Sequence, residues 1–175
     1  SYYHHLGLIQ VSGNGICAAI DPIAVKNLDC LLEVFKKKSV LKVFHAGKQD
    51  LEILNRLCGM AISPVFDTQV AASLLGWGSQ ISFAKVVQKT IGKIIYKTET
   101  YTNWCRRPLS SSQIEYAIDD VRYLAPVYEQ LLEHLKKGNR LEWLKDEFSS
   151  LEDEKSYELP DPQKQYMRIK NFRNL

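Results

Sequence analysis

The order of apolar runs and helical patterns predicts an α/β fold, in which a small mixed sheet carries helices packed against it. Two short apolar runs, Leu6–Ser12 and Ile16–Ile20, flank a glycine-rich turn and predict an antiparallel hairpin. Two further short runs, Val40–Phe44 and Val65–Phe66, suit strands, and each precedes a segment whose apolar residues have helical spacing. The remaining regular patterns are helical, while Lys93–Leu109 shows little regular period and the chain turns polar from Ser149 onward. A length of 175 residues favours one domain with a full hydrophobic core.

The predicted helices begin or end at recognisable signals. Asp67 can accept hydrogen bonds from free backbone N–H groups and suits an N-cap, while Gly59 and Gly92 suit helix ends. We interpret Lys36–Lys38 as a solvated helix C-terminus, favoured by the dipole, rather than as a nucleic-acid site. The predicted helices are Leu28–Phe35, Leu51–Leu57, Thr68–Leu75, Phe83–Ile91, Gln113–Leu124, Val127–Lys137 and Leu141–Phe148.

The stretch Gln113–Leu124 (QIEYAIDDVRYL) is the centre of the functional interpretation. Tyr116 and Asp120 are four residues apart and therefore lie on one helix face. A carboxylate that holds a metal and a phenol that contacts the attacking water could then share one substrate. The alternative, a surface Tyr and Asp on an ordinary amphipathic helix, is the simpler one from this stretch alone. The apolar residues predict one buried stripe, made of Ile114, Ala117, Ile118, Val121 and Leu124.

The stretch Val43–Leu54 (VFHAGKQDLEIL) runs from a strand through a short turn into a helix. Asp50 falls in the first turn of that helix, near the C-terminal edge of the sheet, where α/β folds commonly build sites. A carboxylate at a helix N-terminus is also favoured by the dipole. Asp50 is therefore a candidate metal ligand with a purely structural alternative.

Composition is that of an ordinary globular protein. Lys and Arg number 23 and Asp and Glu 20, and the net charge of +3 permits an anionic partner without requiring one. No apolar run is long enough to cross a bilayer, and no signal peptide is visible. The cysteines form no CxxC pair and no metal-binding spacing. We therefore expect a cytoplasmic protein without membrane contact, with reduced and mostly buried thiols at Cys17, Cys30, Cys58 and Cys105.

Four motifs in a fixed order resemble the ribonuclease D family. They are VFHAxxxDLEIL from Val43, FDTQVAASLLG from Phe66, ETxTxWxxRPLS from Glu99 and YxxxDVRYLxPxYEQL from Tyr116. The resemblance runs from about residue 2 to residue 148. It implies a 3′→5′ exoribonuclease of the DEDD superfamily with a ribonuclease-H-like (DnaQ-like exonuclease) fold. The tyrosine of the last motif, where a sister branch carries histidine, indicates the DEDDy subgroup.

The resemblance also implies roles for three residues. Asp50 and Asp120 match the family's second- and third-motif aspartates, which are metal ligands, and Tyr116 matches the tyrosine that hydrogen-bonds the nucleophilic water. The resemblance implies two divalent ions, Mg²⁺ or Mn²⁺, which prefer carboxylate and water oxygens as ligands. An unperturbed tyrosine is protonated at neutral pH, so we expect Tyr116 to orient the water rather than to deprotonate it.

The family's first motif, a central strand with Asp-x-Glu that supplies two more ligands, does not occur in the sequence. It should lie just before the segment that matches Ser1–Tyr3, and neither Asp21 nor Asp29 has an x-Glu partner. Either a longer parent supplies the strand or the protein is naturally incomplete, and the gap that its absence would leave in the sheet favours a longer parent. We expect an exonuclease domain over residues 1–150 that lacks this strand. Residues 151–175 should form a linker towards the helical RNA-binding domain found in the family.

Four residues are further candidates for nucleic-acid contacts. Trp104 could stack on a base and Arg107 could hold a phosphate; the alternatives, which we prefer, are a core tryptophan and an arginine paired with a carboxylate. Lys48 and Gln49 precede Asp50 and could face the substrate, although a solvated lysine is the simpler interpretation.

Three polar residues near the predicted site have structural interpretations. We expect His45 to be a packed structural residue rather than a general base. Asp67 suits an N-cap rather than a third metal ligand. Asp119 points elsewhere on its helix than Asp120 and is expected to be solvated.

The implied function is metal-dependent 3′→5′ hydrolysis of single-stranded RNA ends, as in the maturation of tRNA or other RNA, with release of nucleoside 5′-monophosphates. One alternative is a catalytically incomplete nucleic-acid-binding or scaffold protein on the same fold. Another is a DNA 3′→5′ exonuclease, which shares the chemistry and differs in the sugar recognised. The joint presence of Asp50, Tyr116 and Asp120 favours an enzyme. No obligate protein partner is evident.

Overall fold

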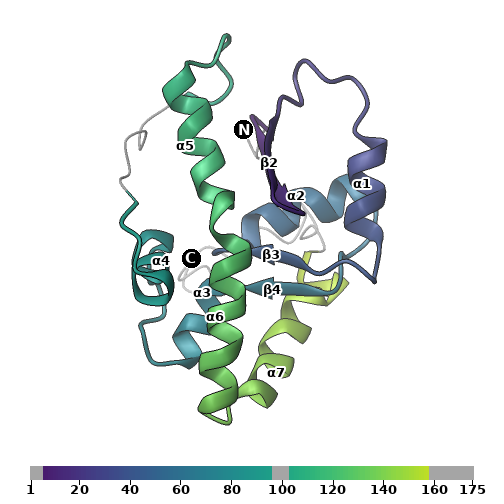
Figure 1. Ribbon diagram of the computed structural model, residues 1–175. Coiled ribbons are helices and arrows are strands. Elements are labelled where there is room, and N and C mark those ends of the chain that lie inside the picture. Colours follow the sequence, from purple (N-terminus) through teal and green to yellow (C-terminus); the bar gives the residue numbers. More distant parts are fainter. Residues whose placement is uncertain (1–5, 96–102, 158–175) are drawn as a thin grey trace, which may run out of the picture.

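The computed structural model describes residues 6–95 and 103–157, apart from the side chain of residue 154. Helices flank short strands, which confirms the predicted α/β class. Figure 1 shows α5 (Ser111–Arg122) and α6 (Leu124–Lys137) following one another almost end to end beside the strands. Ser1–Tyr3 and the part of the predicted linker after residue 157 lie outside the described residues. Within the described ranges, every helix is too short or too polar to cross a bilayer.

The predicted hairpin is present. Strands β1 (Ile9–Gly13) and β2 (Ile16–Ile20) pair antiparallel, with Gly13 opposite Ile16 beside the turn. The two turn residues, Asn14 and Gly15, have φ angles of 51° and 78°. Asn followed by Gly tolerates these positive angles, which a tight hairpin turn requires, and so the local sequence fixes the register.

The other strands form a separate ladder. Strands β3 (Lys42–Phe44) and β4 (Val65–Asp67) pair parallel, with Phe44 beside Asp67. Among the described residues no strand pairing joins this ladder to the hairpin, so the small sheet that we predicted is divided into two strand pairs.

The helices follow the predicted order, with shifts at their ends. Gly59 and Gly92 end α2 and α4 with φ angles of 68° and 70°, as their lack of a side chain allows. The helix predicted at Gln113–Leu124 instead ends at Arg122, and Leu124 begins α6. The remaining helices are α1 (Asp29–Lys36), α2 (Lys48–Cys58), α3 (Thr68–Leu74), α4 (Phe83–Ile91), α7 (Leu141–Glu152) and a 3₁₀ turn at Glu154–Tyr157.

Two clusters of buried side chains hold these elements together. The larger one joins α3, α4, α6 and α7 around Phe66 and Leu131. The smaller one, around Leu51, includes Leu151 and Tyr157 at its edge. The folded part of the chain therefore continues past residue 150, where we expected a linker to begin.

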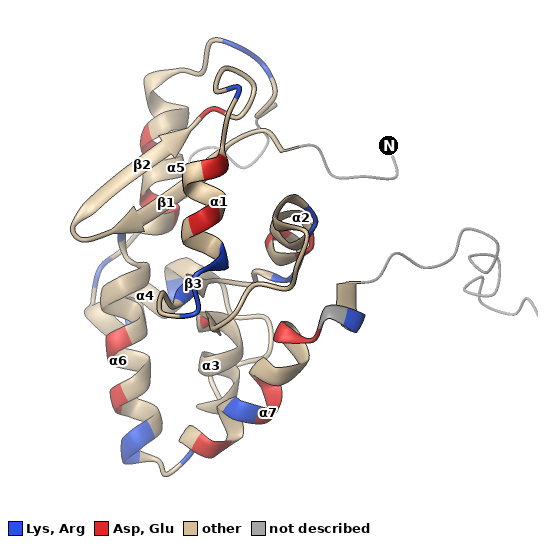
Figure 2. Ribbon diagram, turned by 90° about the vertical axis from the view of Figure 1, so that its right-hand side faces the viewer, with Lys and Arg blue, Asp and Glu red and all other residues tan. Residues whose placement is uncertain are grey.

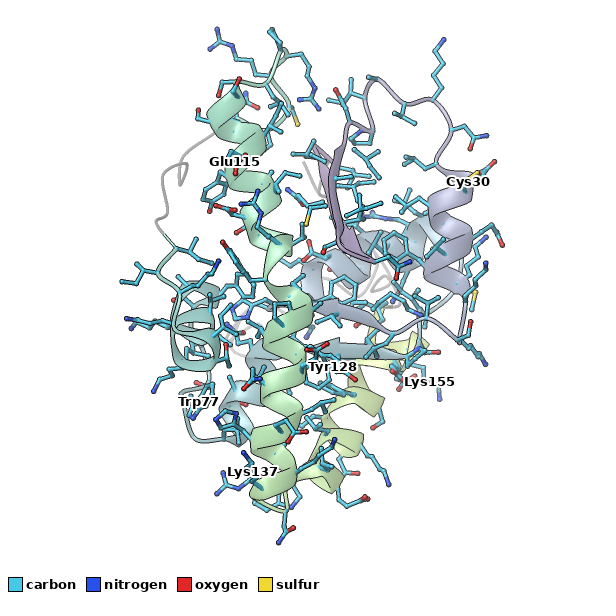
Figure 3. The ribbon with its side chains drawn as sticks, in the orientation of Figure 1. Cys30, Trp77, Glu115, Tyr128, Lys137 and Lys155 are labelled. Atoms are coloured by element: carbon cyan, nitrogen blue, oxygen red, sulfur yellow. The ribbon has the colours of Figure 1, made fainter. Side chains whose placement is uncertain are left out.

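Two burial predictions are wrong. Ala117 and Val121 are buried as expected, but Ile114 in the first turn of α5 is 43% exposed. Of the four cysteines only Cys58 is buried, whereas Cys30 is exposed on the outer face of α1 (Figure 3). Because α1 has no buried residue, an apolar helical pattern there does not bury its cysteine.

The carboxylate of Asp67 connects the two strands of the second ladder to the helices that follow them. It is 3% exposed, and it caps α3 by accepting from the backbone N–H groups of Gln69 and Val70 at 2.8 and 3.3 Å. It also accepts from the N–H groups of Ala46 and Gly47 at 3.1 and 2.8 Å, in the turn between β3 and α2. The predicted N-cap is confirmed, and the same side chain also fixes a turn 20 residues earlier.

An ion pair joins the end of the hairpin to the segment before α5. Arg107 Nε and Nη2 each lie 2.6 Å from the Asp21 carboxylate, which confirms the preferred interpretation of this arginine. Arg107 also donates to the carbonyl oxygens of Gly7 and Trp104, at 2.8 Å each. Hydrogen bonding to this guanidinium is the main reason why the pKa of Asp21 falls from 3.8 to about 2.

Replacing Asp67 by alanine tests the hydrogen bonds that its carboxylate accepts. The Asp67→Ala change leaves one buried and three partly buried backbone N–H groups without this acceptor, so we expect a loss of about 3 kcal/mol in unfolding free energy. Urea unfolding measures it. Asp146→Ala, at an exposed position of α7, is the control and should change stability by less than about 0.5 kcal/mol. Equal stability of the two variants would contradict the assigned role of Asp67.

Replacing Asp21 by asparagine tests the ion pair through its pH dependence. We expect Asp21→Asn to be less stable than the wild type at pH 7. Because folding lowers the pKa of Asp21 from 3.8 to about 2, the wild type's advantage is complete above pH 3.8 and fades as the pH falls towards 2. Urea midpoints of both proteins at pH 7, 5 and 3 measure this. A difference at pH 3 as large as that at pH 7 would refute it.

Candidate active site

Helix α5 places Tyr116 and Asp120 on one face. Its start is fixed by a capping box, in which the Gln113 N–H donates to Ser110 Oγ at 3.2 Å and the Ser110 N–H donates to Gln113 Oε1 at 2.7 Å. Two buried residues on the same helix, Ala117 and Val121, attach it to the body of the protein. Because these two buried residues fix how α5 is rotated about its axis, they also fix the side of the helix on which Tyr116 and Asp120 lie.

The turn between β3 and α2 places Asp50. Ala46 has a φ of 55°, and a side chain at Gly47 would overlap the Phe44 side chain, so the turn is tight and needs a glycine there. Asp67 accepts the N–H groups of both turn residues. Helix α2 starts directly after this turn and carries Asp50 in its first turn.

The three predicted catalytic residues all line one groove of about 960 Å³. Asp50 from α2 and Tyr116 and Asp120 from α5 all line it. Residues of β1 and of β3 line it as well, so the groove lies between the two strand pairs. Lys48 and Gln49 are exposed and do not belong to its lining.

Burial and neighbouring charge act on two of these groups. Desolvation and, to a smaller extent, the negative charge of Asp67 raise the pKa of the Asp50 carboxyl. Desolvation and then the charge of Asp120 raise the pKa of the Tyr116 hydroxyl. Tyr116 is therefore protonated at neutral pH, as expected from the sequence. A cation bound beside Asp50 would favour its charged form, which burial opposes.

The ring of Trp104 packs against the ring of Tyr116. The two rings are stacked, with centroids 6.1 Å apart and planes at 28°. A side chain at Gly7 would come within 3.2 Å of the Trp104 Cβ, so the missing side chain makes room for the tryptophan. Arg107 holds the Trp104 carbonyl. Trp104 and Arg107 do not line the groove. Trp104 is half-buried and belongs to neither cluster of buried side chains, so the preferred interpretation of a core tryptophan is not confirmed; its ring contacts Tyr116.

The other polar residues near the groove have structural partners. His45 Nδ1 lies 2.9 Å from Thr68 Oγ1, and its ring packs against Phe83 at 5.2 Å, which confirms a packed histidine. Asp119 also lines the groove; its side chain is 31% exposed and pairs with Arg122 at 2.9 Å. Our prediction of a simply solvated Asp119 is therefore wrong: its partner stands one turn later on α5.

The donor atoms in the groove suit a divalent cation that shares its coordination with a ligand. No three His, Cys, Asp or Glu side chains come close enough together in the described ranges to hold a metal by themselves. Mg²⁺, however, is commonly bound by one or two carboxylates together with water and substrate phosphates. Asp50 and Asp120 provide two such carboxylates.

Known proteins share both the sequence and the fold. Residues 1–136 match the family model described as 3′-5′ exonuclease. Ribonuclease D of Sphingobium indicum is 42% identical over 172 residues, which cover 97% of this chain and 44% of that protein. The chain thus spans less than half the length of this curated relative.

Two solved structures extend the comparison. RNase D of Escherichia coli, described as an exoribonuclease involved in structured RNA processing, matches with a TM-score of 0.91 and 32% identity over 99% of this chain and 46% of its own. Brucella melitensis NrnC with bound Mg²⁺ matches with a TM-score of 0.76 and 26% identity over 94% of this chain and 80% of its own. These matches confirm the resemblance seen in the motifs, and the chain belongs to the 3′-5′ exonuclease family.

Proposed function

We propose that the protein is a metal-dependent exoribonuclease that removes nucleotides one at a time from single-stranded 3′ ends. The observation that carries this proposal is that Asp50, Tyr116 and Asp120 all line one groove. Membership of the 3′-5′ exonuclease family supports the reaction class. The proposed products are nucleoside 5′-monophosphates.

In the proposed mechanism Asp50 and Asp120 would hold the metal, Mg²⁺ or Mn²⁺. When bound, such ions lower the pKa of the attacking water and stabilise the leaving 3′ oxygen. Tyr116 orients that water through a hydrogen bond, because its raised pKa keeps the phenol protonated. The stacked Trp104 holds the phenol ring in place, and the turn fixed by Asp67 holds Asp50.

A further strand with two more carboxylates would complete the ligand set. We propose that it lies between β1 and β3 and carries the family's Asp-x-Glu motif, supplied by a longer parent. Two observations support this position: both strands line the groove, and no described strand pairs them with each other. We further propose that residues 158–175 connect this domain to a helical RNA-binding domain.

The proposed substrates are precursors of tRNA or other structured RNA in the cytoplasm. Support comes from the E. coli relative, whose description names structured RNA processing. A second candidate is a non-catalytic RNA-binding or scaffold protein, which is favoured by the absence of a three-residue metal cluster from the described part of the chain. A DNA exonuclease would share the groove and differ in the response to a 2′-hydroxyl.

The first test is an exonuclease assay on this chain. We expect 5′-labelled single-stranded RNA to give a ladder that shortens from the 3′ end with Mn²⁺ and not with EDTA. A circular RNA of the same sequence should resist, because it has no 3′ end, and a matched DNA strand tests the sugar. If the folded chain gives no ladder, the assay is repeated with the natural sequence that precedes Ser1. Failure of that form would refute the enzyme and favour the scaffold.

Asp120→Asn separates catalysis from folding in whichever form of the protein gives the ladder. Asp120 is exposed, so the change should leave the melting temperature within about 2 °C, whereas removing a metal-binding charge should abolish shortening. Tyr116→Phe should slow the reaction by roughly 10²-fold or more, because the water loses its orienting group. Asp146→Asn on α7 serves as control. A fully active Asp120→Asn protein would refute the ligand assignment.

A further inference from the structure

Helix α4 carries a basic face that has no acidic partner among the described residues. Lys85 and Lys89 are exposed and stand four residues apart on α4, and the exposed Lys93 follows directly after its C-cap. The sequence contains no Asp or Glu between Asp67 and Glu99. Among the described residues, none of these three lysines lies within 4.0 Å of a carboxylate oxygen. We call Lys85, Lys89 and Lys93 the α4 lysine face.

Three other helices each pair one lysine with a glutamate one turn away. Figure 2 shows acidic residues beside basic ones on α1, α6 and α7. Like charges four residues apart weaken a helix slightly, and no carboxylate offsets this on α4. The arrangement therefore costs some stability and fits an anionic partner. The lysine pairs at i,i+3 on the other helices are Lys36–Glu33 at 3.0 Å, Lys136–Glu133 at 3.5 Å and Lys145–Glu142 at 2.7 Å.

The α4 lysine face begins at the groove. Phe83 and Ala84, in the first turn of α4, are part of the groove lining. Lys93 Nζ lies 5.3 Å from the centroid of the Tyr123 ring, at the C-terminal end of the helix that carries Tyr116 and Asp120.

Farther from the groove, a lysine of this face also lies beside an aromatic ring. Lys89 Nζ lies 5.4 Å from the centroid of the Trp77 ring. Trp77 belongs to the α3–α4 loop beside α6, as Figure 3 shows. Cations interleaved with aromatic rings are a common surface for single-stranded nucleic acids, because phosphates meet the charges and bases meet the rings.

We propose that the α4 lysine face binds the phosphate backbone of single-stranded RNA upstream of the 3′ end that occupies the groove. This inference rests on the proposed function, because it assumes an RNA 3′ end in the groove. Lys85 and Lys89 are about 6 Å apart along the helix axis, so each can meet a different phosphate of an extended strand. Contacts of this kind add affinity without sequence preference, and they matter only for substrates long enough to leave the groove.

A binding measurement tests this on the intact chain without requiring catalysis. Fluorescence anisotropy in EDTA, which prevents metal-dependent hydrolysis, follows a 5′-labelled 12-nucleotide RNA and a tetranucleotide. The variant is Lys85→Glu/Lys89→Glu, which keeps the spacing of like charges in the helix. We expect the Kd for the 12-mer to rise roughly tenfold and its salt slope to fall by about 1.4, as for two lost phosphate contacts. The tetranucleotide should bind within twofold of wild type.

The control makes the same change in charge at another exposed lysine pair. Lys37→Glu/Lys38→Glu, after α1, should bind the 12-mer within twofold of wild type. Equal weakening by both variants would show a general charge effect and overturn the proposal, as would unchanged binding by Lys85→Glu/Lys89→Glu. A wild type that binds neither RNA in EDTA would also overturn the proposal for the α4 lysine face. The proposed function is tested separately by the Mn²⁺-dependent ladder, so the two failures are distinguishable. Melting temperatures confirm that each variant is folded.

Discussion

The Asp67 carboxylate accepts four backbone hydrogen bonds at a place that is 3% exposed, and the geometry of the candidate site depends on it. Two of these bonds begin α3, and the other two close the turn from β3 into α2. A buried carboxylate needs donors for its lone pairs, and the N–H groups of the tight turn at Ala46 and Gly47 need an acceptor, so each satisfies the other. Asp50 lies about one helical turn after Ala46 and Gly47, whose N–H groups donate to Asp67. Its position is therefore set by a neighbour that does not itself line the groove.

Much of the fold was predictable because its signals are local. The Asn14–Gly15 turn, the left-handed glycines at helix ends and the Asp67 cap each depend on residues within one turn of each other. The common face of Tyr116 and Asp120 follows from helix periodicity alone. The motif order then placed Asp50 in the same site, which periodicity could not do.

What escaped prediction depends on contacts between distant segments. The bonds from Asp67 to residues 46 and 47, and those from Arg107 to Asp21 and Gly7, span 20 to 100 residues. No local pattern encodes them; Arg107 was expected only to meet some carboxylate. The predictions of buried side chains failed for a similar reason. Ile114 and Cys30 have apolar neighbours in sequence, but the elements around them leave those positions uncovered.

The hairpin formed by β1 and β2 packs against α5, which follows it by about a hundred residues, and the bond from Arg107 to Gly7 spans the same interval. During synthesis the hairpin therefore leaves the ribosome well before its partner exists. At about 5–20 residues per second, this interval lasts roughly 5–20 s. Over that time the apolar face of the hairpin is open to water and to other chains. The order of elements thus exposes the nascent protein to chaperones until α5 emerges.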